Sequence, residues 1–378
     1  MVFLRALVAT ARMIRHTAHL SAGLPPDDEV LLDAPDGRLA PVLVAAAADD
    51  FKPAAELLAA TRENAEWESR DRYVTRLAAF TRSRPGWFAD WQSADPHSPD
   101  AALITAQRAA SRTELLPETT LLREVVPLIE AAASADDADP VPWRIALDHA
   151  RNSRAPRTAF AAHWDQAVRR SSHHYGCHVA ALRYLGSRPD SSPAECLDFA
   201  ENAAAQALPR SLLRALPLRT AYAHLDAAAT PHAALADSGM GLGGGGGGSV
   251  GRGARTGRRA HRSSGSGVPA RAAAGIDERR VDTAADLAIE MSARYEPGDP
   301  WPAEVRNLLA YTLVTRSRWA DALAQFRLIG PHATSLPWQH ISDDPLGQFL
   351  EVRDGVRIQL ASTIPLRHRP GQEIANDH

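Results

Sequence analysis

Apolar residues in this chain recur with helical spacing almost everywhere, and the alternation typical of β-strands is almost absent. One apolar stripe lies in residues 121–133 and consists of Leu121, Val125, Leu128, Ile129 and Ala132, with Pro127 predicting a kink. A second stripe lies in residues 301–314 and consists of Trp301, Val305, Leu308, Leu309 and Thr312. Both stripes are typical of a helix with one buried face. We therefore expect an all-α fold.

Asp-Pro pairs precede an apolar run in four segments: 93–104, 138–147, 298–307 and 343–350. An aspartate can accept hydrogen bonds from the free N–H groups at a helix start. Proline suits the first turn of a helix, where its missing N–H costs nothing. The pairs therefore predict the starts of separate helices, and they leave no room for the βαβ units of a nucleotide-binding sheet.

Residues 303–329 show the clearest repeat signal. With Ala303 as the first position of a 34-residue unit, small and large residues alternate as two closely packed helices require. The residues concerned are Leu309, Ala310, Leu313, Ala322 and Phe326, with Trp319 beginning the second helix. This pattern resembles a degenerate tetratricopeptide repeat, with Ala310 in place of the usual Gly and Leu313 in place of the usual Tyr. Residues 53–80 resemble a second such pair through Leu57, Leu58 and Trp67.

Four further segments extend the resemblance: 67–104, 139–156, 163–185 and 318–338. They are similar to a family of helical bacterial proteins of uncharacterised function, encoded in GC-rich, actinomycete-type genomes. The resemblance covers most of residues 30–236 and 281–350. It implies an array of antiparallel helix pairs, a tetratricopeptide-like α-solenoid, and it supplies no catalytic residues. The Lys-Trp-containing turn usual in that family is replaced near residue 187 by "LGSRPDSSPAE".

A Gly- and Arg-rich segment interrupts the helical pattern, most clearly at residues 241–267. Its glycines lose much backbone entropy on ordering, and it has few apolar side chains to bury, so we expect disorder. This predicts a helical array at 1–236, a linker at 237–276 and a C-terminal helical block at 277–378, joined without a fixed arrangement. Two alternatives to a passive linker are a stretch translated out of frame and an Arg-Gly tail that binds nucleic acid through phosphates alone.

Charge and cysteine content exclude several classes of protein. The net charge of the 378-residue chain is −3, which favours neither nucleic acid nor an anionic membrane as a partner. Two cysteines, Cys177 and Cys196, are too few for a disulfide framework.

The N-terminal residues 1–20 have the apolar spacing of an amphipathic helix. Arginines interrupt the apolar stretch that a signal peptide would need, and no apolar run of the chain is long enough to span a membrane. We expect a cytoplasmic protein.

The stretch "HHYGCH" at 173–178 is the one cluster of chemically reactive side chains. His174, Cys177 and His178 have a spacing that puts them on one helix face, and imidazole and thiolate are zinc ligands. His163 is the nearest candidate for a fourth ligand. The alternative is that these residues cap and pack a helix that starts near Ser171 and Ser172. A catalytic Cys–His pair that includes Cys196 is a third interpretation.

No catalytic motif accompanies this cluster: the chain has no phosphate-binding glycine loop, no nucleophile elbow and no zinc-protease helix signature. The tryptophans fall mostly at helix starts and seams, where we expect them to anchor one helix on the next. We therefore expect a non-enzymatic adaptor, without a cofactor or metal, whose concave face binds a protein or peptide. The alternative is an enzyme or metal-binding protein centred on residues 173–178.

Overall fold

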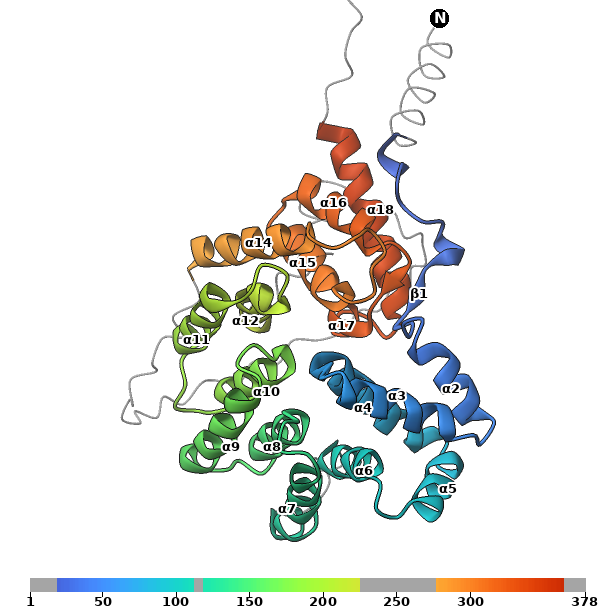
Figure 1. Cartoon of the computed structure of the whole chain (residues 1–378). Helices are drawn as coiled ribbons and strands as arrows, with labels where there is room; N and C mark the ends of the chain where they lie inside the picture. Colours follow the sequence, from blue (N-terminus) through green and yellow to red (C-terminus); the bar gives the residue numbers. More distant parts are fainter. Residues whose placement is uncertain (1–18, 112–117, 225–276, 364–378) are drawn as a thin grey trace, which may run out of the picture.

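The computed structural model describes residues 19–111, 118–224 and 277–363, and these are mostly helical (Figure 1). The helix expected within residues 1–20 and the Gly- and Arg-rich segment 237–276 lie almost entirely outside the described residues. No helix in these three ranges is long and apolar enough to span a membrane.

Helices before residue 225 follow one another through short connections. Their bounds are α2 Leu39–Ala47, α3 Lys52–Glu63, α4 Trp67–Ser83, α5 Gly86–Ala94, α6 Pro99–Ser111, α7 Glu118–Ala135, α8 Val141–Asn152, α9 Arg157–Arg170, α10 Tyr175–Gly186, α11 Pro193–Gln206 and α12 Leu216–His224. Two short 3-10 helices are η1 Asp27–Glu29 and η3 Leu212–Ala215. After residue 276 come α14 Glu278–Ser292, α15 Ala303–Thr315, α16 Trp319–Ile329, α17 Ser335–Trp338 and α18 Pro345–Thr363.

Three of the four Asp-Pro segments act as the sequence predicts. The Oδ1 atoms of Asp139, Asp299 and Asp344 accept backbone N–H groups at or just before α8, α15 and α18, at distances of 2.8, 2.8 and 2.9 Å. In the fourth segment, Ser98 takes this role, since its Oγ accepts the Ala101 N–H at the start of α6. Helix α7 runs through Pro127.

Helix α15 corrects the expectation of a single buried face. All but one of its residues from Ala303 to Val314 are buried, including Arg306 and Asn307 on the side where the sequence stripe predicts solvent. The reason is its central position, because α12, α14, α16, α17 and β2 all contact it. Arg306 is tolerated there because its guanidinium donates to backbone carbonyls of Ser292, Tyr295 and Leu328.

The six residues of the repeat pattern lie in this core. Helix α16 begins at Trp319, as the pattern predicts, and Trp319 is partly buried against the cluster. The other five are fully buried: Leu309, Ala310, Leu313, Ala322 and Phe326.

Two short segments far apart in the sequence pair as parallel strands, which the helical pattern does not predict. They are β1 (Leu31–Leu32) and β2 (His332–Ala333). Next to them, Arg327 Nε donates to Ala22 O (2.9 Å), and Arg353 Nη1 donates to Pro25 O (3.2 Å). The first described segment therefore packs on α16 and α18, which brings both ends of the helical series together (Figure 1).

One hydrophobic core contains residues from both sides of the undescribed segment 225–276. Leu212 and Leu218, from η3 and α12, belong to the same cluster of buried side chains as Ala285 in α14 and Leu308 in α15. The expectation that the two helical blocks are joined without a fixed arrangement is therefore wrong for the described residues, because side-chain packing sets their arrangement. The boundaries at 236 and 277 stay a prediction.

Candidate binding groove

Two pockets lie on the two sides of the contact between α4 and α10. The junction pocket, with a volume of about 460 Å³, lies where these helices meet the residues around β1, β2 and the start of α15. The arginine pocket, of about 330 Å³, is enclosed by α4, α6, α8 and α10. The two pockets share Asp71, Thr75 and Gly176. We call them together the groove.

Gly176 allows the close contact between α4 and α10. A Cβ atom at this position would lie 2.1 Å from Asp71 Oδ2, so a larger residue would push Asp71 away. Gly176 belongs to the stretch "HHYGCH", and its small size therefore fixes the distance between the walls of the groove.

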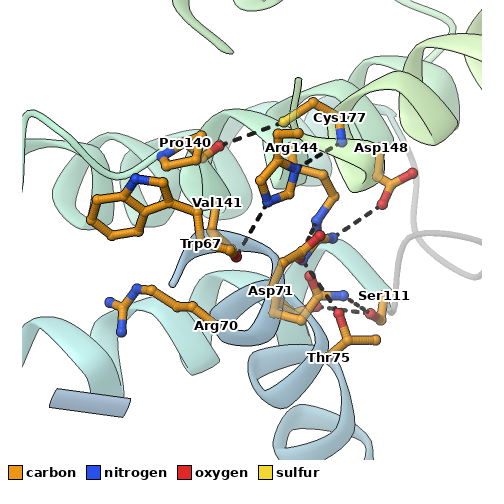
Figure 2. A network of polar contacts seen from close by, with 12 residues as sticks. Trp67, Arg70, Asp71, Thr75, Ser111, Pro140, Val141, Arg144, Asp148 and Cys177 are labelled. Carbon is orange, nitrogen blue, oxygen red and sulfur yellow. Dashed lines mark hydrogen bonds and ion pairs between the residues drawn. The ribbon is translucent and has the colours of Figure 1, made fainter. Parts of the chain in front are cut away.

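Arg144 forms ion pairs with both carboxylates of the arginine pocket, those of Asp71 and Asp148 (Figure 2). Its Nε donates to Asp71 Oδ1 (2.7 Å), and its Nη1 donates to Asp148 Oδ2 (3.1 Å). Burial lowers the pKa of Arg144, but the two adjacent carboxylates outweigh burial and raise this pKa above its ordinary value. The group is thus a charged, buried and well-paired wall of the pocket.

Arg151 and Arg183 line the same pocket without an acidic partner among the described residues. The Nε and Nη2 atoms of Arg151 donate to the amide oxygen of Asn152, at 3.0 and 2.9 Å. Arg183 is exposed, and the described part of the chain gives its guanidinium no hydrogen bond or ion pair. Desolvation by neighbouring protein atoms lowers the pKa of Arg183, the charge of Asp148 raises it, and the charges of Arg219, Arg151 and Arg144 lower it further.

In the junction pocket, by contrast, the acidic side chains are engaged by the fold. Glu68 Oε1 accepts the backbone N–H of Tyr175 (2.9 Å), and Glu304 forms an ion pair with Arg219. Asp36 accepts the Tyr73 hydroxyl (3.0 Å), and the pKa of Tyr73 is raised to about 12 by burial and by this hydrogen bond.

Arg72 connects α4 to the start of α15 across the junction pocket. Its guanidinium lies 3.9 Å from the centre of the Trp301 ring and donates to Trp301 O (2.8 Å). A cation over an indole face is a favourable contact. This wall of the groove is therefore held by interactions inside the chain.

His174 and His178 occupy structural positions at the start of α10. His174 is the N-cap: its Nδ1 accepts the Cys177 N–H (3.1 Å), and its Nε2 contacts Trp67 O (3.2 Å). The cluster therefore caps and packs a helix start, as the alternative to a zinc site predicts, and the helix begins at Tyr175, a few residues after Ser171 and Ser172. His178 Nδ1 contacts His174 O (3.0 Å), and the His178 ring packs edge-on against Trp164. Both nitrogens of His174 are therefore engaged.

Cys177 and His163 do not complete a cluster with them. Cys177 is fully buried, and its Sγ lies 3.9 Å from Pro140 O (Figure 2). Burial raises the pKa of the Cys177 thiol well above its ordinary value. His163 lies beside the Trp143 ring, at 6.2 Å between centres. Within the three described ranges, no group of three or more His, Cys, Asp or Glu side chains could hold a metal ion.

Cys196 lies in a different part of the core from Cys177. It packs with Val179 and Ala200, whereas Cys177 packs with Leu147 and Ala167. Both thiols are free and buried. The geometry gives no support to a Cys–His pair made from α10 and α11.

Comparisons of the chain with protein-family models, with curated proteins and with solved structures found no significant match.

Sequence reasoning missed the residues that line the arginine pocket, above all Asp71, Arg144, Arg151 and Arg183. Asp71 is on α4, Arg144 and Arg151 are on α8, and Arg183 is on α10, and charged residues on a helix are typical of a solvated face. Only the packing of α4, α8 and α10 brings them together. The one available signal was the spacing of Arg144, Asp148 and Arg151, which puts three charges on one face of α8.

Proposed function

We propose that this protein is a non-enzymatic adaptor that binds a peptide segment of another protein in the groove. The observation that carries the proposal is the arginine pocket. Four helices form its concave wall, and Arg151 and Arg183 in that wall form no ion pair with the described residues. Helical arrays typically use such concave surfaces for binding. The reduced, buried cysteines are compatible with the cytoplasm as the location.

The proposal includes a tetratricopeptide-like arrangement of antiparallel helix pairs. Its support is local: α15 and α16 are joined by a short turn and contact each other extensively, with the small residues Ala310 and Ala322 fully buried in the shared core. Small residues at such positions allow two helices to approach closely.

The alternative, an enzyme or metal-binding protein centred on residues 173–178, has no specific observation in its favour. His174 is used as a helix cap, and burial disfavours the thiolate form of Cys177. A metal site would need both groups to be available as ligands.

Selection of peptides from a display library on the full-length protein tests the proposed function. The selected peptides are then measured against Thr75→Trp, since Thr75 is exposed and lines both pockets. An indole at this position should block the groove and abolish binding. Val44→Trp is the matched control, because Val44 is 72% exposed and lies in neither pocket. Failure to select any peptide, or equal binding by Thr75→Trp and the unmodified protein, would overturn the proposal.

A further inference from the structure

The charged side chains that line the arginine pocket leave a single positive charge. They are two carboxylates and three guanidinium groups: Asp71, Asp148, Arg144, Arg151 and Arg183. Arg144 forms ion pairs with both carboxylates. One monovalent anion therefore neutralises the pocket lining, whereas a dianion would reverse its charge.

Arg183 on α10 is the guanidinium group of the pocket that is open to such an anion. Its side chain is exposed, and it forms no hydrogen bond or ion pair with the described residues. Arg151, by contrast, donates from Nε and Nη2 to Asn152 Oδ1. Asp148 raises the pKa of Arg183 without forming an ion pair with it, and its Oδ2 accepts Arg144 Nη1 (3.1 Å) instead. The N–H donors of Arg183 are thus available to a ligand.

We propose that the arginine pocket binds one carboxylate group of a peptide, with Arg183 as the hydrogen-bond donor. A guanidinium presents its N–H groups in a planar fork that matches the two oxygens of a carboxylate. A carboxylate carries one negative charge near pH 7, which equals the excess charge of the pocket. The proposal rests on the proposed adaptor function only for the claim that a peptide supplies the carboxylate.

Gln107 on α6 supports a peptide as the source of the carboxylate. It is only 7% exposed, and its Nε2 donates to Ser111 Oγ (2.9 Å), whereas its Oε1 has no hydrogen-bond partner among the described residues. A buried acceptor without a partner is unfavourable, and an N–H group of a bound peptide can satisfy it. Gln107 and Arg183 line the same pocket of about 330 Å³, so the pocket offers an acceptor for a peptide N–H as well as a donor for its carboxylate.

NMR titration of the full-length protein with N-acetylglycine tests the carboxylate site without a selected peptide. With isotope-labelled arginine, the Nε–H cross-peak of Arg183 is the one that is missing from Arg183→Lys. N-acetylglycine should shift this cross-peak saturably, and N-acetylglycinamide at equal ionic strength should not, because it lacks the negative charge. The control is the cross-peak of Arg279, an exposed arginine on α14 that lies in neither pocket. Absence of a saturable shift at Arg183, an equal shift with the amide, or the same shift at Arg279 would overturn the proposal.

Peptides selected on the full-length protein identify which carboxylate is bound. Each peptide is compared with its C-terminal amide and with forms in which each acidic side chain is replaced by its amide. Removal of one carboxylate should weaken binding by about tenfold or more, because charge-assisted hydrogen bonds are lost. Arg183→Gln should abolish this difference, and Arg279→Gln should preserve it. The carboxylate whose removal matters, at the C-terminus or on an acidic side chain, is the source.

The two proposals fail in different ways. A difference between acid and amide forms that persists in Arg183→Gln overturns the carboxylate assignment, even where Thr75→Trp blocks the same peptide and so supports the adaptor. Saturable binding of N-acetylglycine at Arg183, with no peptide selected, supports the carboxylate site and contradicts the adaptor.

Discussion

Replacement of Phe326 by alanine should strongly destabilise the protein. Phe326 is fully buried, stacks on Trp338 with ring centres 6.3 Å apart, and packs edge-on against Phe349 at 5.2 Å. Truncation of a buried phenylalanine costs about 3–5 kcal/mol, and aromatic pairs add about 0.5–1.5 kcal/mol to their burial. We therefore expect a loss near the upper end, about 4–5 kcal/mol. At roughly 2–4 °C per kcal/mol, the melting temperature should fall by at least about 8 °C.

The assay is thermal unfolding followed by hydrogen exchange, with Val44→Ala as the control for an exposed apolar residue. Because Leu218 of α12 shares the core cluster with Phe326, exchange protection should be lost in α12 as well as in α14–α16. A fall of less than about 2 °C would contradict the packing argument. Loss of protection restricted to residues 277–363 would show that the shared cluster does not couple the two sides of the chain.

Three further predictions concern the core and its buried charges. Ala322→Leu should lower the free energy of unfolding by about 1–3 kcal/mol, because the larger side chain overpacks the contact between α15 and α16. An unchanged urea midpoint would show that this contact is loose. Asp139→Asn should lower the free energy of unfolding by about 2–3 kcal/mol. This is less than the effect of leaving a buried charge with no partner, because the Arg70 guanidinium keeps its ion pair with Asp100. A urea midpoint equal to that of the unmodified protein would contradict this. Burial and the charge of His163 lower the pKa of His149 below its ordinary value of 6.5. The contribution of neutral His149 to stability should therefore be complete above about pH 6.5 and decline as the pH falls toward the folded-state pKa. His149→Phe should flatten that decline in the free energy of unfolding, and parallel stability curves for the two proteins would refute this.

The helices themselves were largely predictable because periodicity and capping are local properties. Asp139 and Asp344 precede helix starts in the sequence, and both accept N–H groups at those starts. The first residue of α16 was predicted from the repeat pattern, which begins the second helix at Trp319.

The burial of α15 and the pairing of β1 with β2 could not be predicted, because both depend on what packs around a segment. Asparagine is a residue type typical of the surface, yet Asn307 lies inside the core. Its Oδ1 accepts the Trp338 Nε1–H (2.9 Å), and its Nδ2 donates to His332 O (3.1 Å). The groove escapes sequence reasoning for the same reason. The charges that form it come from three helices, α4, α8 and α10. The histidines at 173–178 are adjacent in the sequence, but His174 caps α10 and His178 packs against Trp164.

The proposal that the groove binds a peptide is tested most directly by hydrogen exchange of the full-length protein with and without a selected peptide. Binding in the groove should slow exchange in the segments around Thr75, Arg151 and Arg183, on α4, α8 and α10. The same peptide should leave exchange on α2 near Val44 unchanged. Protection confined to other surfaces, with no change at these three segments, would contradict the assignment of the groove as the binding site.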